Sequence, residues 1–220
     1  MNNHSKCLGR AEVERIAQRK DGAKYQTILA AAVAVMAESG YHGAQVARIA
    51  RVAGVADGTV YLYFKNKEDI LVSILRETIG EIVTLSTLLE GDHPEPLKAL
   101  HKLIDAHFQT LGQNPALATV LQVHIRQADP GIRAQVAEIM RPYQQTIARI
   151  VEMGVSCGEM RKKLDLRIAR RMIFGTIDET VNAWIFTGAK YDLTALVDPV
   201  FDVLVTGLAG NREYDQEGRE

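Results

Sequence analysis

Residues 54–71 read GVADGTVYLYFKNKEDIL, and their pattern is highly specific. It begins with Gly54, Val55 and Ala56, which separate a short helix predicted over Val46–Ala53 from another predicted over Asp57–Tyr63. A three-residue turn with glycine first is typical of a helix-turn-helix. Glycine suits that place because the chain turns sharply there and a left-handed backbone costs least without a Cβ atom. The stretch therefore predicts a small DNA-binding head.

Several side chains of this stretch suit contact with DNA. Small residues would let the second helix approach closely, hydroxyl groups could bind phosphates, and cations would add attraction. These features are supplied by Gly58, Thr59, Tyr61, Tyr63, Lys65 and Lys67. Phe64 is expected in the core, and for Tyr61 and Tyr63 packing in the core alone is the alternative.

Charge is unevenly divided along the chain. Residues 1–67 carry ten Lys or Arg and five Asp or Glu, whereas residues 68–220 carry sixteen and twenty-two, so the net charges are +5 and −6. The net charge of −1 for the whole chain hides this difference. A basic first third on an acidic remainder is what a nucleic-acid-binding head on a larger body would show, although chance could also produce it.

The rest of the chain predicts an all-α fold of about nine helices. Its 220 residues are 47% hydrophobic, which excludes wholesale disorder, and no stretch reads as a strand pair or a repeat. The predicted helices are Lys24–Ser39, Val46–Ala53, Asp57–Tyr63, Lys67–Leu89, Leu97–Leu111, Ala116–Gln127, Ile132–Cys157, Leu164–Thr187 and Leu193–Leu208. Gly40 is expected to stop the first helix in the left-handed conformation, and Pro142 to kink a later one. Pro199 could kink the last helix or restart it.

The segment 54–71 resembles the TetR family of bacterial one-component repressors. The similarity begins near Tyr25 and includes Gly40-Tyr41, Gly43 and Ile49-Ala50. It implies that Asp57–Tyr63 is the recognition helix. The residues that the resemblance places at DNA are Gln45, Val46, Asp57, Gly58, Thr59, Tyr61, Leu62, Tyr63, Lys65 and Lys67.

Three positions depart from the family pattern. Ala56 stands where the family usually has Ser or Thr, so Asp57 could cap the recognition helix instead. Asp57 stands where Lys is frequent, and it could also accept a hydrogen bond from a cytosine amino group. Leu62 stands where His is frequent, which weakens any base contact from that position. The bases that are read therefore stay open.

The C-terminal part is similar to the acyl-CoA-responsive branch of the family, the FadR-type repressors of fatty-acid degradation. The similarity rests on residues 165–180 (DLRIARRMIFGTIDET), on Trp184, on residues 190–193 and on the Leu121-Gln122 region. It implies a repressor that binds a palindromic DNA operator and is released by long-chain acyl-CoA, with no cofactor.

An acyl chain needs an apolar tunnel, which a helical bundle can open between its helices. The candidate lining residues are Leu103, Ile104, His107, Phe108, Leu111, Leu121, Gln122, Ile150, Ile173, Phe174, Ile177, Asp178 and Trp184. The CoA phosphates need cations, and the candidates are Arg126, Arg133, Arg161, Lys162, Lys163, Arg167, Arg170 and Arg171. Each apolar candidate could equally be ordinary core, and each cation part of a solvated face.

Asp178 and Glu179 interrupt an apolar helical segment, Met172–Phe186. An unpaired buried carboxylate is costly, so we expect a pairing with a cation such as Arg126, or a wet cavity, with a surface position for Glu179 as the alternative. The same segment is apolar on two faces, which predicts burial of one face in the bundle and of the other in a second subunit. The Leu193–Leu208 helix would complete that homodimer.

Four parts are thus expected. They are a flexible N-terminal tail (1–20) with some helical character from Ala11 to Lys20, a helix-turn-helix domain (21–70), a ligand-binding and dimerisation domain (71–208) and a flexible C-terminal tail (209–220). The Lys67–Leu89 helix would belong to both domains and couple them.

Other classes of protein fit less well. The histidines lack metal-ligand spacing, and no nucleophile or phosphate-loop motif is present, so we expect no enzyme and no metal site. Two cysteines, no apolar stretch of about 20 residues and no secretory signal favour the cytoplasm and no membrane partner. Two rivals remain: a TetR-type repressor that responds to another hydrophobic molecule, such as a cationic drug, and an adaptor that has lost DNA binding.

Overall fold

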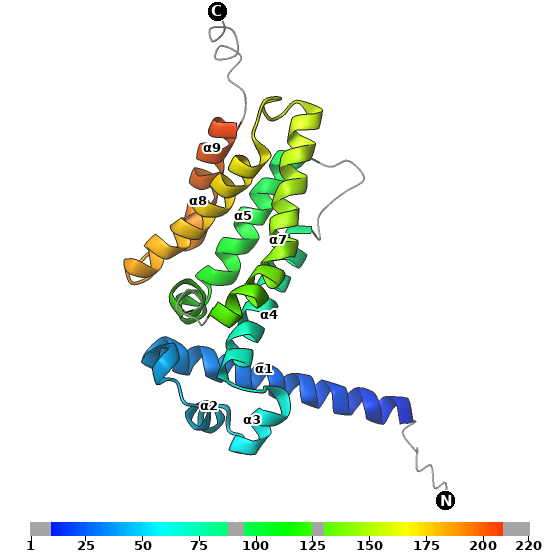
Figure 1. Cartoon of the computed structure of the whole chain (residues 1–220), viewed down its shortest axis with the longest axis vertical. Helices are drawn as coiled ribbons and strands as arrows, with labels where there is room; N and C mark the ends of the chain where they lie inside the picture. The colour runs from blue at the N-terminus through cyan, green and yellow to red at the C-terminus, as the bar shows by residue number, and fades with distance from the viewer. Residues whose placement is uncertain (1–9, 88–94, 125–129, 209–220) are drawn as a thin grey trace, which may run out of the picture. The chain divides into compact units, whose positions relative to one another are not determined.

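A computed structural model of the chain describes residues 10–87, 95–124 and 130–208, and within these residues it is helical without strands (Figure 1). This confirms the all-α prediction. The chain divides into two compact units, residues 1–71 and 72–220. The α-helices are α1 (Arg10–Gly43), α2 (Val46–Ala53), α3 (Asp57–Tyr63), α4 (Lys67–Thr87), α5 (Pro96–Gly112), α6 (Pro115–Thr119), α7 (Pro130–Cys157), α8 (Leu166–Phe186) and α9 (Val197–Leu208).

The first unit contains the predicted helix-turn-helix. Helices α2 and α3 begin and end at the residues that the sequence predicted, and Gly54 between them has φ 68° and ψ 29°, the left-handed conformation. Its N–H donates to the carbonyl groups of Ala50 and Arg51, which ends α2. Ile49 and Val60 are buried, so the two helices close over one small core with α1.

Helix α1 differs from the prediction at both ends. Residues 10–20, expected in a flexible tail with some helical character from Ala11 to Lys20, are its first three turns, because Ala, Glu, Arg, Gln and Lys are strong helix formers even without an apolar stripe. At the other end Gly40 has φ 72° and ψ 163°. The positive φ was predicted, but the ψ value is extended rather than left-handed, and this conformation is essentially restricted to glycine.

The starts of α3 and α4 are capped differently. The N-cap of α3 is Ala56, which makes no side-chain cap hydrogen bond. The idea that Asp57 caps α3 is therefore wrong: Asp57 is its first residue, where a carboxylate favours the positive end of the helix dipole. At α4 the Asp69 N–H donates to Asn66 Oδ1 over 2.8 Å, and Asp69 Oδ2 accepts from the Lys65 N–H over 2.9 Å. This exchange resembles a capping box and fixes where α4 begins.

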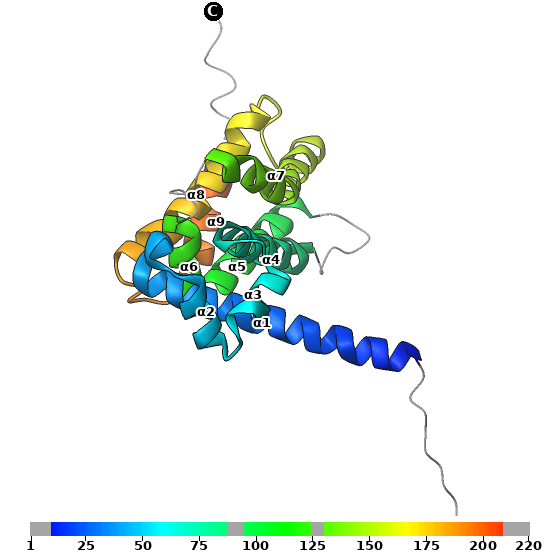
Figure 2. The same ribbon diagram turned by 60° about the horizontal axis from the view of Figure 1, so that its bottom comes forward.

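The second unit is a bundle around α5. Figure 2 looks roughly along its helices and shows α5 in the middle, among α4, α8 and α9. Leu100, Leu103, Ile104 and Phe108 of α5 are fully buried. Since α5 is enclosed on several sides, a buried polar side chain on it, such as that of His107, needs partners inside the bundle.

Two predicted helices are divided in the structure. The Ala116–Gln127 helix is α6 followed by a π-helical segment, η1 (Val120–His124), and its last residues lie outside the described part. The Leu193–Leu208 helix is a 3₁₀ turn, η3 (Leu193–Leu196), followed by α9. Pro199 lies in the first turn of α9, where its missing N–H costs nothing, so it restarts the helix. Pro142 lies inside α7, which is assigned as one helix throughout.

Some expectations lie outside the described residues. These are the ends of both tails (1–9 and 209–220), the last two residues of the Lys67–Leu89 helix, and Arg126. Within the described residues, no helix is long and apolar enough to cross a membrane. The same residues contain no group of three or more His, Cys, Asp or Glu placed to hold a metal ion.

Replacing Gly54 by alanine is expected to destabilise the first unit by about 1 kcal/mol, because alanine is strained at φ 68° while nothing lies within 4 Å of its added Cβ. Gly58→Ala is the matched control, since Gly58 lies in α3 and also faces open space; it should be neutral or stabilising. Urea unfolding followed by circular dichroism measures both. Equal stabilities for the two variants would contradict the argument.

Candidate DNA interface and ligand cavity

The recognition helix predicted from the sequence presents side chains to solvent. Tyr61 is 56% exposed and Leu62 is 82% exposed, although large hydrophobic side chains are usually covered. Gln45, Asp57, Gly58 and Lys65 are exposed as well, and Val46, Thr59 and Tyr63 are half-buried. Phe64 is buried and its ring stacks on that of Tyr25, with the ring centroids 5.1 Å apart. The predicted division between exposed residues and core therefore holds for Tyr61 and Phe64.

Lys67 is held within the first unit. Its Nζ donates to the Tyr41 carbonyl over 2.7 Å and to the His42 carbonyl over 3.3 Å, and lies 4.5 Å from the centroid of the Tyr41 ring. These contacts tie the start of α4 to the end of α1. In this conformation the ammonium group is engaged by the protein, so a DNA contact from Lys67 stays a prediction.

A cavity of about 210 Å³ lies inside the second unit. It is smaller than the roughly 300–1,000 Å³ usual for small-molecule pockets. Most of its lining is apolar and comes from α4, α5, η1, α7 and α8. The lining residues are Leu75, Thr78, Ile79, Ile82, His107, Leu111, Leu121, Gln122, Val136, Met140, Phe174 and Asp178.

Two polar pairs lie at this cavity. His107 Nδ1 is 3.1 Å from the Tyr143 hydroxyl, and both side chains are buried. Burial lowers the pKa of His107 to about 4, against a smaller opposing effect of the Asp178 charge, and burial also raises the pKa of Tyr143. Gln122 Nε2 donates to Asp178 Oδ1 over 3.0 Å. At neutral pH the imidazole and the phenol are therefore uncharged.

The structure brings together part of the predicted ligand-binding set. His107, Leu111, Leu121, Gln122, Phe174 and Asp178 line the cavity. The other apolar candidates, which are buried but do not line it, are Leu103, Ile104, Phe108, Ile150, Ile173, Ile177 and Trp184. Trp184 Nε1 donates to the Tyr191 carbonyl over 2.7 Å, which satisfies its indole N–H within the bundle.

The predicted cations are not gathered around this cavity. Among the described candidates, Arg133, Arg161, Lys162, Lys163, Arg167 and Arg171 are exposed, and Arg170 is half-buried. Arg161 donates to the Gly207 carbonyl and Arg167 to Asp165. Arg126, the expected cation partner of Asp178, lies outside the described residues. Glu179 is exposed, which agrees with the alternative that it has a surface position.

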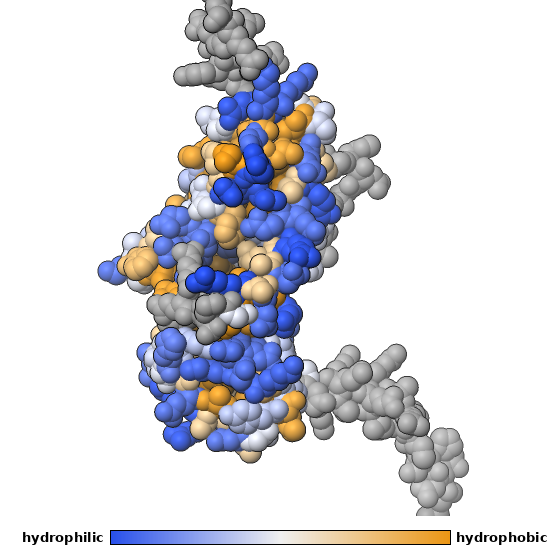
Figure 3. Space-filling view, viewed as in Figure 1, coloured by the Kyte–Doolittle hydropathy of each residue, from blue (hydrophilic) through white to orange (hydrophobic). Residues whose placement is uncertain are grey.

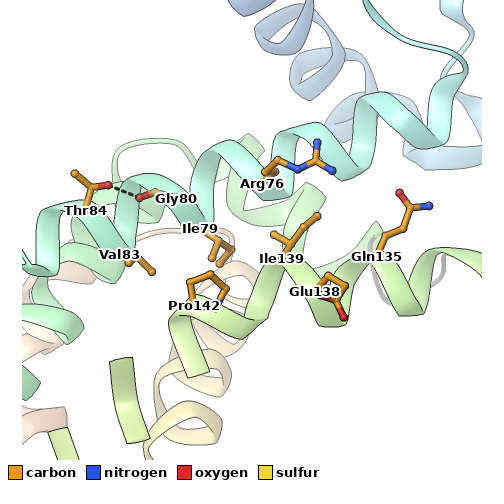
Figure 4. Close-up of a pocket in the computed structure, with 9 residues that line it drawn as sticks. All are labelled: Arg76, Ile79, Gly80, Val83, Thr84, Gln135, Glu138, Ile139 and Pro142. Carbon is orange, nitrogen blue, oxygen red and sulfur yellow. Dashed lines mark hydrogen bonds between the residues drawn. The ribbon is translucent and has the colours of Figure 1, made fainter. Parts of the chain in front are cut away.

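Sequence reasoning missed the contribution of α4 and α7. Leu75, Ile79 and Ile82 line the cavity from one face of α4, and their i, i+4, i+7 spacing was a signal that could have found them. A groove of about 570 Å³ lies between α4 and α7, and Figure 4 shows Ile79 pointing across it toward Pro142. Ile79 lines both spaces, and Arg76 lines the groove.

An exposed helix-turn-helix on one unit and an apolar cavity in the other define a two-part regulator that binds DNA and a small molecule. The family models agree with this division. Residues 28–74 match the model of bacterial regulatory proteins of the tetR family, and residues 75–207 match that of the C-terminal region of YsiA-like proteins. The chain belongs to the TetR family, which confirms the resemblance of residues 54–71.

Individual proteins and solved structures that are similar to this chain are regulators of fatty-acid metabolism or degradation. The chain is 46% identical over 188 residues to the fatty acid metabolism regulator protein of Bacillus subtilis, a match that covers 84% of this chain and 95% of that protein. The crystal structure of FadR from Bacillus subtilis in complex with stearoyl-CoA is 44% identical, with a TM-score of 0.79, over 84% of this chain and 99% of that one. The fatty acid degradation regulator FadR from Bacillus halodurans is 43% identical, with a TM-score of 0.80, over 84% and 96%.

The buried histidine makes stability depend on pH. The pKa of His107 is lowered from 6.5 to about 4 on folding, so on acidification the unfolded chain takes up the proton first. Protonation of His107 should therefore lower the free energy of unfolding by up to about 3 kcal/mol as the pH falls from 6.5 to 4. Above pH 6.5 the residue is neutral in both states and this loss of stability is absent. Replacing His107 by glutamine removes the titration and should flatten the profile. Identical pH profiles of urea unfolding in the two proteins would contradict this.

Proposed function

We propose that the chain is a transcriptional repressor of fatty-acid degradation genes that long-chain acyl-CoA releases from its operator. The observation that carries the proposal is the apolar cavity in the second unit of a chain whose 44% identical relative was crystallised with stearoyl-CoA. An acyl chain is the kind of ligand that an interior lined by Leu, Ile, Val, Met and Phe accepts. Such a regulator would act in the cytoplasm, where DNA and acyl-CoA meet.

The small volume of the cavity indicates how a ligand would act. At about 210 Å³ the cavity is smaller than the pockets that usually hold small molecules, so we expect a long acyl chain to widen it by moving the lining helices. Ile79 of α4 lines both the cavity and the groove beside it, so a displacement of Ile79 would join the two spaces. Arg76 lines that groove and could meet a phosphate of CoA.

The DNA-binding part of the proposal rests on α3. Tyr61 and the residues predicted with it would contact phosphates and base edges, with Asp57 and Thr59 at the start of the helix. A palindromic operator would be read by two copies, whose recognition helices meet successive major grooves. Ligand binding would shift the population away from that spacing, since an effector acts only through its differential affinity for two states.

The direct test measures DNA release by three related molecules. A binding sequence is first selected from random double-stranded DNA, and the complex is then titrated with palmitoyl-CoA, free CoA and palmitate while fluorescence anisotropy reports bound DNA. We expect palmitoyl-CoA to release the DNA at concentrations at least about tenfold below the other two, because only the thioester combines the chain with the phosphates. No selected sequence, or no release by palmitoyl-CoA, would contradict the proposal.

A repressor that responds to a cationic drug is the second candidate. Asp178 lines the cavity and its carboxylate would favour a cation. Two further residues that would suit a cation do not reach the cavity lining, since Glu179 is exposed and Trp184 is packed in the bundle. Adding a hydrophobic quaternary ammonium compound to the same titration distinguishes the candidates: release by that compound alone would favour this second reading.

The second unit also leaves apolar surface uncovered on α8 and α9. Phe186 is 79% exposed and Val203 is 69% exposed, and Figure 3 shows hydrophobic side chains over this region. Met172, Gly175 and Ala183 of α8 line a further surface depression. Exposed apolar surface of this kind marks an interaction site, and we propose that a second copy of the chain covers it.

Replacing Phe186 or Val203 by aspartate should weaken the dimer about a hundredfold, tenfold for each copy, because a two-fold interface contains every substitution twice. Sedimentation velocity at several concentrations measures the change. Leu85→Asp is the matched control, since Leu85 is exposed on α4, away from this surface. An unchanged dimer in both interface variants, or a monomeric wild type, would exclude this arrangement.

A further inference from the structure

His107 carries a polar atom that the chain leaves unused. The side chain is on α5, is 5% exposed and is among the residues that line the cavity. Its Nδ1 faces the Tyr143 hydroxyl, while its Nε2 has no hydrogen-bond partner among the described residues. Buried polar groups without partners are rare in native proteins and call for a functional explanation.

The Tyr143 pair determines which nitrogen holds the proton. If the hydroxyl donates to Nδ1, the neutral ring carries its proton on Nε2, and one donor in the pair is left unsatisfied. If Nδ1 donates instead, the phenol proton and the Nε2 lone pair are both left unsatisfied. The arrangement in which the hydroxyl donates to Nδ1 leaves fewer buried groups without partners. Nε2–H is therefore a buried donor without an acceptor among the described residues.

The surroundings define which acceptor fits. Among the described residues that line the cavity there is no Lys or Arg, and the charge that acts on the imidazole ring is the Asp178 carboxylate. A ligand carboxylate would meet that like charge in a mostly apolar space. An uncharged carbonyl oxygen satisfies the donor without this cost.

We propose that His107 Nε2–H donates a hydrogen bond to the thioester carbonyl oxygen of bound acyl-CoA, and thereby makes the site selective for thioesters over free fatty acids. The inference rests on the proposed function and deepens it. His107 is the specificity-determining residue, and Tyr143 is a positioning residue that holds the ring in the donating tautomer.

The test compares two ligands that differ only at the carbonyl group. They are palmitoyl-CoA and hexadecyl-CoA, a thioether in which CH₂ replaces C=O. Isothermal titration calorimetry gives both affinities for the wild type and for His107→Phe and His107→Met, which lack the donor; whichever variant folds can be used. The wild type should bind the thioester about tenfold more tightly than the thioether, and in the variants the ratio should fall to about one.

Using a ratio within each protein separates recognition from stability, since any general loss of packing weakens both ligands alike. His107→Gln is the matched control, because its amide can donate from a similar position and should keep part of the preference. A wild-type ratio near one, or a ratio in His107→Phe equal to that of the wild type, would overturn the inference while leaving the proposed function intact. No binding of palmitoyl-CoA to the wild type would overturn both.

Discussion

Helix α4 runs across the boundary between the two units, so the helix-turn-helix and the ligand cavity share one continuous helix. It starts in the first unit, where Asn66 and Asp69 exchange hydrogen bonds with the backbone around its first turn, and continues into the second, where Leu75, Ile79 and Ile82 line the cavity. A continuous α-helix has no soft joint, because each backbone N–H is bonded one turn back. In the proposed mechanism, a movement of its cavity-lining half would be carried along the helix toward its capped end.

The contacts of Lys67 show where such a movement would be felt. The side chain begins α4, and its Nζ is bonded to the carbonyl groups that end α1. Because the bonded groups are backbone carbonyls rather than mobile side chains, the start of α4 is anchored to the frame of the helix-turn-helix. The anchoring of one end and the apolar contacts of the other make α4 the element whose position a ligand and DNA could both affect.

Local chemistry explains what the sequence could predict. Gly54 allowed the bounds of α2 and α3 to be placed at the residues where the structure has them, since a left-handed residue between two short apolar patterns admits few structures. The division of the Ala116–Gln127 helix into α6 and η1 could not be read, because a π-helical segment depends on how Val120 and Leu121 pack in the bundle rather than on local propensity. The cavity was found in part: lining residues of α5, η1 and α8 were candidates, whereas those of α4 and α7 were not. The His107–Tyr143 pair beside it was also missed, since the two residues are 36 positions apart in the sequence.

The small size of the cavity also bears on how the proposed ligand would act, namely by changing the conformation of the bundle rather than by occupying an existing space. If the interior were already wide enough for a long acyl chain, the ligand would bind without changing the conformation of the protein. Here the space is about 210 Å³ and holds a buried imidazole with an unsatisfied nitrogen, so the unliganded state is compact yet carries an unpaired polar group. In the proposed mechanism, a ligand that supplies both apolar volume and a carbonyl oxygen would stabilise a wider state that the chain alone disfavours. The difference between the two states, rather than the tightness of binding, is what can be transmitted along α4.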